Sequence, residues 1–248
     1  MCMTYKYFEK IKELINIVEI EEKENMDKAT KVITNAILNK KSIFSFGASH
    51  AGILSEELFY RAGGLVVINP IFPKNLMLDT YPITMTSEME RLEGYGTVIA
   101  KKSNISSGDV VIVHSVSGRN PVSIEVAMES KKKGATVICI TNLKYSKEVS
   151  SRHSSGKNLY EVSDIVIDNH GDKGDACVEI KGLSQKVGPS STVIAATIMN
   201  SIVAEVTQEL IDNGIKTPPI FYSANIDGGD EINKRIFEEY KDMIHYKF

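Results

Sequence analysis

The chain has 248 residues, 42% of them hydrophobic, and its formal net charge at pH 7 is −3. A chain of this size can bury a core of its own, and its mild acidity disfavours nucleic acid as a partner. Cys2, Cys139 and Cys177 are too far apart for a disulfide framework or a metal-ligand motif, which favours a reduced, cytoplasmic location. The N-terminus is amphipathic and acidic enough to be no signal peptide, so we expect no membrane partner. The histidines are dispersed and form no ligand motif, so we expect no metal, and we expect no other cofactor.

The first 40 residues predict an N-terminal helical arm. Apolar residues recur at helical spacing from Tyr5 to Val18 and again from Met26 to Ile37. We therefore divide the chain into an arm over residues 1–40 and one domain over residues 41–248 that ends with a helix.

Beyond the arm, short β-branched runs alternate with helical patterns. Such alternation predicts an α/β fold, in which a parallel sheet is covered by helices on both faces. The longest apolar run, "TVIAATIMNSIVAEV", is interrupted by Asn200 and is too short to span a bilayer. We expect it to form a buried helix over residues 191–213.

The first unusual strand-to-helix turn is "FGASHAG", which contains Gly47, Ser49, His50 and Gly52. Ligands of open parallel sheets bind at such turns, where helix N-termini converge. This turn lacks the glycine spacing of a dinucleotide site and the lysine of a nucleotide-phosphate loop. It offers a hydroxyl and free helix N–H groups to an anion, although Ser49 could also serve only as a helix cap.

The second turn, "HSVSGRNPVS", follows the apolar strand "VVIV" and carries Ser115, Ser117 and Asn120. Asn120 before Pro121 is a good helix N-cap, so structure alone explains that pair. Structure alone does not explain the two serines, which would cradle a phosphate at the start of a helix. Adjacent parallel strands would bring both turns together, which favours a phosphate-containing ligand.

The segments "FGASHAGILSEELFYRAG" and "VVIVHSVSGRNPVSIEVAMESKKKGATVICITN" resemble the two signature segments of the SIS (sugar isomerase) domain family. The resemblance covers roughly residues 42–213. It implies a flavodoxin-like, doubly wound three-layer α/β/α sandwich. It also implies a phosphosugar substrate and a homodimer or homotetramer as the active unit.

The resemblance also implies roles for individual residues. Ser49 would bind the ligand in the first turn, with His50 beside it, and Ser115 and Ser117 would bind the phosphate. Asn120 stands where the family usually has Ser or Thr, and its amide can still donate a hydrogen bond. Glu57 would match the catalytic glutamate of phosphoheptose isomerases, although a salt-bridged surface carboxylate is the alternative.

Aldose–ketose isomerisation through an enediol needs a base and a partner that moves protons at the sugar oxygens. Glu93 falls near an acidic position of the related isomerases and is a second catalytic candidate, whereas a capping box with Ser87 would explain Glu90. His170, in a glycine-rich loop, is our candidate for the acid partner, and His50 and His114 are further options. The long helix lacks the histidine that the isomerases carry there.

Three further residues are candidates for substrate binding. Ser190 and Ser191 start the long helix, and capping explains only one of these hydroxyls. Asn225 lies in a loop that is either a turn or a lid. The favoured function is a phosphosugar isomerase. A phosphosugar lyase or etherase, a non-catalytic phosphosugar sensor and a scaffold with a vestigial site remain open.

Overall fold

In the computed structural model, which describes residues 5–246, the β-branched runs form a five-stranded parallel sheet with strand order β2-β1-β3-β4-β5. All residues of β1 and β3 are buried, because helices cover both faces of the sheet. The five strands are β1 (Ile43–Gly47), β2 (Ile68–Ile71), β3 (Val110–His114), β4 (Thr136–Thr141) and β5 (Ile165–Asp168).

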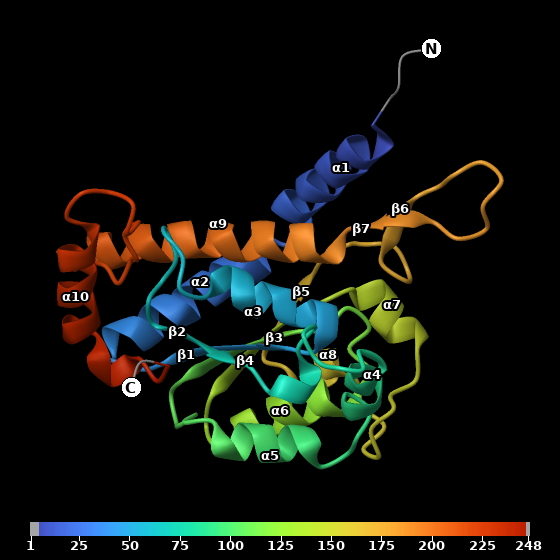
Figure 1. Ribbon diagram of the computed structural model, residues 1–248, viewed down its shortest axis with the longest axis horizontal. Coiled ribbons are helices and arrows are strands. Elements are labelled where there is room, and N and C mark those ends of the chain that lie inside the picture. The colour runs from blue at the N-terminus through green and yellow to red at the C-terminus, as the bar shows by residue number, and fades with distance from the viewer. Residues whose placement is uncertain (1–4, 247–248) are drawn as a thin grey trace.

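Two helical layers cover the sheet, and Figure 1 shows them above and below it. Each layer packs against its own face of the sheet, and each forms a separate apolar core with the strands. The first layer consists of α2 (Lys23–Leu38), α3 (Ile53–Leu58) and α9 (Ser191–Asp212), and the second of α5 (Tyr95–Lys102), α6 (Pro121–Lys132) and α8 (Leu159–Val162). This arrangement confirms the predicted α/β/α sandwich with flavodoxin-like strand order.

Smaller elements lie around this sandwich. The hairpin of β6 and β7 extends beyond the body next to the start of α9 (Figure 1). These elements are α4 (Thr84–Met89), α7 (Leu143–Glu148), α10 (Gly229–Glu239), β6 (Ala176–Val178), β7 (Val187–Pro189) and 3₁₀ turns at Ser49–Gly52, Lys74–Leu76 and Lys241–Met243. No helix within residues 5–246 has both the length and the apolarity needed to cross a membrane.

The two N-terminal helices differ in what they contact. Ala29 and Ile33 of α2 lie in one core with Ile43 of β1. Leu14 of α1 (Lys6–Glu21) belongs to the same core, but α1 lies on the outer side of α9 (Figure 1). Cys2 and the rest of residues 1–4 fall outside the described part of the chain, as do residues 247–248. The division into an arm over 1–40 and a domain over 41–248 stays a prediction.

The topology directs attention to the carboxyl ends of β1 and β3. These strands are neighbours, with Gly47 opposite His114 in the register. The chain leaves β1 toward α3 on one face of the sheet and leaves β3 toward α6 on the other. Such a switch point is where doubly wound sheets bind their ligands.

Candidate functional site

The first turn, residues 47–52, is built tightly onto the end of β1. A Cβ added to Gly47 would lie 2.3 Å from the Ala51 carbonyl oxygen, so only glycine fits there. Ser49 has a left-handed backbone with φ of 52°, and its Oγ is buried with no hydrogen-bond partner in the described residues. A strained serine with an unpaired hydroxyl is typical of a functional turn rather than of a simple cap.

His114 joins the two strand ends. Its Nδ1 lies 3.0 Å from the Ala51 carbonyl oxygen, which can only accept, so Nδ1 carries the proton. Burial lowers the pKa of His114, with the Ala51 carbonyl and then Asp175 acting the other way. The ring is therefore neutral near pH 7, and Nε2 keeps a buried lone pair without a protein partner within residues 5–246.

The second turn, residues 115–120, leaves its hydroxyl groups available. Neither Ser115 nor Ser117 uses its Oγ in a hydrogen bond within the described part of the chain, and Ser117 is half-buried. Gly118 has φ of 61° and lies against Ser146 and Thr141, where a side chain would collide. The turn is thus fixed while its two hydroxyls stay free for a ligand.

Asn120 occupies the N-cap position of α6, followed by Pro121 as expected, but its side chain does not cap the helix. Instead its Oδ1 accepts a hydrogen bond of 2.9 Å from Nη1 of Arg152. The first N–H groups of α6 therefore have no side-chain acceptor. Pro121 has no N–H and the Val122 N–H donates to the Glu90 carbonyl oxygen, so the Ser123 N–H is the helix donor that remains for an anion beside the two free hydroxyls.

Glu90 lies next to this turn, because its carbonyl oxygen accepts from the Val122 N–H in the first turn of α6. Burial raises the pKa of the Glu90 carboxyl, and a hydrogen bond from Asn120 and the charges of Arg91 and Arg152 oppose the shift. The expected capping box with Ser87 is wrong, since α4 already begins at Thr84. Glu90 is thus a candidate functional residue, although its sequence pattern predicted only a helix-capping role.

Glu57 lies apart from both turns, in a groove between α3 and α9. Its carboxylate pairs with Arg61 one helical turn away and accepts a hydrogen bond of 3.1 Å from Asn200 Nδ2. The groove has a volume of about 730 Å³, and its lining includes Ile53, Thr192 and Val193. Glu57 therefore faces a partly apolar groove rather than the serines of the second turn.

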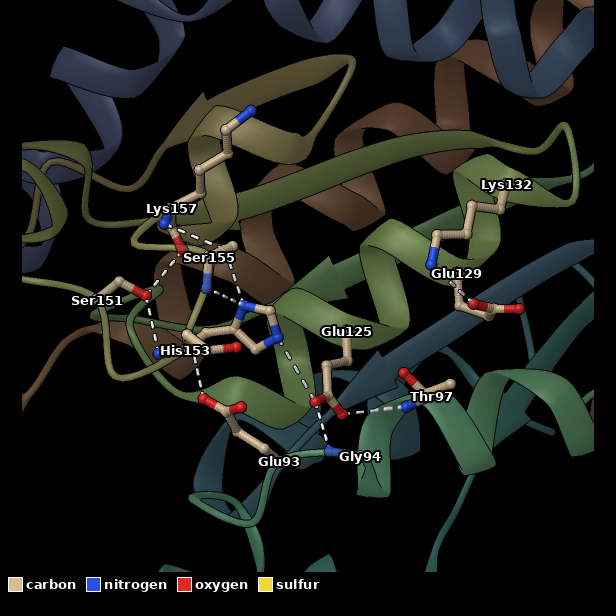
Figure 2. Close-up of polar contacts among 11 residues, drawn as sticks. Glu93, Gly94, Thr97, Glu125, Glu129, Lys132, Ser151, His153, Ser155 and Lys157 are labelled. Carbon is tan, nitrogen blue, oxygen red and sulfur yellow. Dashed lines mark hydrogen bonds and ion pairs between the residues drawn. The ribbon is translucent and has the colours of Figure 1, made fainter.

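Glu93 contacts the loop formed by residues 149–158. Its Oε1 accepts a 2.6 Å hydrogen bond from the backbone N–H of Ser154. Figure 2 shows it beside His153, whose Nε2 lies 3.6 Å from the buried carboxylate of Glu125. Glu93 thus helps to hold this loop in place.

His170 turns away from the switch point. Its Nε2 lies 3.0 Å from Oε1 of Glu22, at the junction of α1 and α2. The hydrogen bond to Glu22 raises the pKa of His170 against a smaller effect of burial, and the same bond contributes to the lowered pKa of Glu22 although burial acts the other way. The position supports a structural link between the arm and the loop after β5.

Ser190 and Ser191 are buried and already paired. Their backbone N–H groups donate to Oδ1 of Asp175 at 3.1 and 2.7 Å, and the Ser191 hydroxyl donates to Oδ2 at 2.7 Å. Asp175 therefore occupies the N-terminus of α9, where we expected Ser190 and Ser191 to bind a ligand.

The remaining candidates lie at the surface. His50 is exposed, directly after Ser49. Asn225 lines a separate cavity of about 730 Å³ together with aromatic residues such as Tyr60 and Phe237. The structure thus brings Ser49, Ser115, Ser117 and Asn120 to one edge of the sheet and leaves Asn225 elsewhere.

Residues 5–246 contain no group of three or more His, Cys, Asp or Glu side chains that could hold a metal ion. Cys139 and Cys177 are free thiols, and burial raises the pKa of Cys139 to about 12. Cys139 is therefore neither an anion nor a nucleophile near neutral pH.

The comparisons agree with this fold. A family model described as "SIS domain" matches residues 6–142. A UPF0309 protein from Shouchella clausii is 51% identical over 99% of this chain and 100% of its own length. A phosphoheptose isomerase from Neisseria gonorrhoeae superposes with a TM-score of 0.54 at 14% identity, over 82% of this chain and 96% of that one. Another from Francisella tularensis gives 0.53 at 12%, over 82% and 95%.

Proposed function

The chain belongs to the SIS-domain family, and from that premise we propose that it binds a phosphosugar at the carboxyl ends of β1 and β3. The observation that carries the proposal is the second turn. There the free hydroxyls of Ser115 and Ser117 flank an α6 N-terminus that has no side-chain cap. The two hydroxyls and the Ser123 N–H can together donate to all three oxygens of a phosphate.

The first turn would hold the sugar. Ser49 and His50 follow β1, the strand beside β3, and the lone pair on Nε2 of His114 lies at the end of β3. A sugar whose phosphate binds the second turn would extend toward these groups. We therefore keep Ser49, His50, Ser115, Ser117 and Asn120 as the proposed substrate-binding set.

The reaction that we propose is aldose–ketose isomerisation through an enediol. A base removes the proton from C2, the C1 carbonyl oxygen accepts a proton, and the enediol collapses when a proton is delivered to C1 as the C2 hydroxyl gives up its own. Glu90 is favourably placed as the acid or base, because it is largely buried, its pKa is raised, and it lies beside Asn120. A sensor would need the binding turns alone, so Glu90 favours an enzyme.

Glu57 remains the alternative base, on the strength of the family resemblance. It lies in the groove between α3 and α9. That groove exposes Val193 and Ala204 of α9, so a second copy of the chain packed there would enclose Glu57. We accordingly propose a homodimer or homotetramer. A cytoplasmic location is supported by the free thiols of Cys139 and Cys177.

The first experiment measures binding. A panel of hexose and heptose phosphates in a thermal-shift assay should raise the melting temperature, because a ligand that binds only the folded state stabilises it. The same sugars without phosphate are the control. If no phosphosugar raises the melting temperature, the proposed function is wrong.

The second experiment measures chemistry. Proton NMR in deuterated water should record exchange at C2 of an aldose phosphate and at C1 of a ketose phosphate. Glu90→Gln should slow this exchange about 100-fold or more, the usual contribution of a general acid or base. Glu57→Gln tests the alternative, and Glu231→Gln on the surface of α10 is the matched control. Binding without exchange would instead identify a sensor, and cleavage of the sugar would identify a lyase or etherase.

A further inference from the structure

Arginine is scarce in this chain and is concentrated at one place. Of the 29 lysines and arginines, only five are arginines, namely Arg61, Arg91, Arg119, Arg152 and Arg235. Three of them lie around the N-terminus of α6, although they come from three segments that are distant in the sequence. Guanidinium groups bind carboxylates and phosphates through paired hydrogen bonds, which lysine cannot do, so this concentration needs an explanation.

Arg119 and Arg152 are held together by direct hydrogen bonds. The backbone N–H of Arg152 donates to the carbonyl oxygen of Arg119 at 2.9 Å, and Nε of Arg119 donates to the Ser150 carbonyl oxygen at 3.0 Å. Nη1 of Arg152 reaches Asn120 at 2.9 Å. Both side chains thus bond across the contact between the second turn and loop 149–158, Arg119 to the loop and Arg152 to the turn.

Arg91 joins them from the end of α4, because the preceding residue, Glu90, bonds the first turn of α6. Burial and then the like charges of Arg119 and Arg91 lower the pKa of Arg152, with Glu90 acting the other way. None of the three guanidinium groups is within ion-pair distance of a carboxylate in residues 5–246. The protein therefore keeps three positive charges close together, with the Glu90 carboxyl nearby but not in an ion pair with any of them.

Loop 149–158, which carries Arg152, is firmly attached. Ser154 is bound by Glu93, His153 lies against Glu125, and the Asn158 side chain donates to two carbonyl oxygens. The Glu125 carboxylate in turn accepts from the backbone N–H groups of Gly94 and Thr97, as Figure 2 shows. Arg152 is thus positioned before any ligand arrives, and an ordered cation loses little entropy on binding.

We propose that Arg91, Arg119 and Arg152 form a second anion subsite, and that the ligand is a phosphosugar with a second acidic group, either a carboxylate or another phosphate. This inference rests on the proposed function. The first phosphate already has donors in the hydroxyls of Ser115 and Ser117 and in the Ser123 N–H. Arg119 points from the turn toward Ser150, so its charge acts beside the phosphate position rather than within it. One phosphate dianion would leave part of this positive charge unmatched.

The test compares ligands with one and two acidic groups by isothermal titration calorimetry at fixed ionic strength. Glucose 6-phosphate and fructose 6-phosphate carry one. 6-Phosphogluconate adds a carboxylate, and fructose 1,6-bisphosphate adds a phosphate, so the two arms identify the second group. We expect one of the latter pair to bind about 10-fold more tightly than its single-acid counterpart.

Variants assign this preference to the arginines. Arg91→Gln and Arg152→Gln should reduce the affinity ratio between double-acid and single-acid ligands toward one. Arg235→Gln removes one exposed arginine from α10 and should leave the ratio unchanged.

The outcomes separate the two proposals. If single-acid phosphosugars bind as tightly as the double-acid ligands, the second subsite is refuted and the phosphosugar site stands. If the arginine variants weaken both kinds of ligand equally, the arginines bind the first phosphate, and the inference is also overturned. If no phosphosugar binds, the proposed function fails and this inference fails with it.

Discussion

At the scale of single residues, the hydrogen bonds of each serine indicate whether its hydroxyl stabilises the fold or is available to a ligand. Ser190 and Ser191 are buried and paired with Asp175, whereas Ser117 is half-buried and its hydroxyl has no partner in the described residues. A hydroxyl that makes no contact in the free protein contributes little to folding. Removal of this hydroxyl should therefore weaken ligand binding without changing the stability of the protein.

We predict that Ser117→Ala weakens phosphosugar binding about 10-fold or more, because a hydrogen bond to a charged group contributes about 1.5–3 kcal/mol. The melting temperature of the free protein should change little. Titration calorimetry and a thermal melt measure the two effects, with Ser184→Ala in the exposed β6–β7 hairpin as the control. Equal affinity in the Ser117 and Ser184 variants would remove Ser117 from the site.

Glu90 permits a second prediction at this scale. Its pKa is raised in the folded state, so folding is favoured by the protonated carboxyl, and stability is lost as pH rises from the unfolded pKa through the folded one. Glu90→Gln should therefore raise the melting temperature at pH 8, by about 2–4 °C if the burial penalty is ~1 kcal/mol. The gain should vanish below about pH 4, where the unfolded carboxyl is also protonated. A variant that melts lower at pH 8 would show that Glu90 stabilises the fold as an anion.

At the scale of elements, α5 and α6 approach unusually closely. A Cβ on Gly96 would lie 2.3 Å from the Val122 carbonyl oxygen and 2.8 Å from Cβ of Glu125. Because Glu125 binds the N-terminal N–H groups of α5, the same contact sets the position of Glu93 and of loop 149–158.

We predict that Gly96→Ala destabilises the protein by about 1–3 kcal/mol, the usual cost of overpacking. Urea denaturation measures the change. Val98→Ala on the exposed side of α5 is the control and should cost less, since Val98 is 53% exposed. Similar urea midpoints for Gly96→Ala and Val98→Ala would mean that α5 can move to accommodate the added methyl group without a loss of stability.

The link between the N-terminal helices and the loop after β5 depends on pH. The His170 pKa is raised, so its contribution to stability is complete below the unfolded pKa of about 6.5 and is lost as pH rises through the folded value. The Glu22 pKa is lowered, so its contribution is lost as pH falls through a folded value below 4.5. The Glu22–His170 pair therefore stabilises the protein most at pH values between the folded pKa of Glu22 and the folded pKa of His170.

His170→Asn should lower the melting temperature at pH 6 by about 2–4 °C, which corresponds to ~1 kcal/mol for a half-buried pair in a chain of this length. The difference should shrink above pH 8. Melts across this pH range test the prediction, and C2 exchange measured on the same variant tests the catalytic role considered for His170. A loss of exchange with no pH-dependent change in stability would favour catalysis.

On the scale of the whole molecule, the five-stranded sheet and the peripheral segments should open at different free energies. Strand β3 is the central strand, β4 pairs with β3 and β5, and nearly all residues of both are buried, whereas the β6–β7 hairpin extends beyond the body (Figure 1). Local opening of such a hairpin requires little buried surface to be exposed.

We predict that native-state hydrogen exchange is slowest in β3 and β4 and fast in the tip of the hairpin, residues 179–186. Loop 149–158 should be protected at Arg152 and Ser154, whose backbone N–H groups are hydrogen-bonded. Mass spectrometry of deuterated fragments measures all three regions. Exchange in this loop as fast as in the hairpin tip would contradict the attachment of Arg152 on which the second anion subsite depends.

The sequence predicted the sandwich well, because β-branched runs buried on both faces leave few alternatives to a covered parallel sheet. It also predicted that the first and second turns follow neighbouring strands. It did not identify Glu90 or Arg152 as candidates. The start of α4 at Thr84, which rules out a capping role for Glu90, and the contact of Arg152 with Asn120 both depend on tertiary contacts, which leave no periodic pattern in the sequence. The partners of Ser190 and His170, namely Asp175 and Glu22, lie 15 and 148 residues away and could not be identified from local patterns.

The uncapped start of α6 has a consequence for how this protein can change over generations. A side chain at position 120 that accepted from the Ser123 N–H would stabilise the free chain by about 1 kcal/mol. Such a side chain would also compete with any anion for the same donor. Laboratory evolution for heat resistance alone should therefore accumulate substitutions that close this helix end, and survivors of that selection should lose their ligand before they lose their fold.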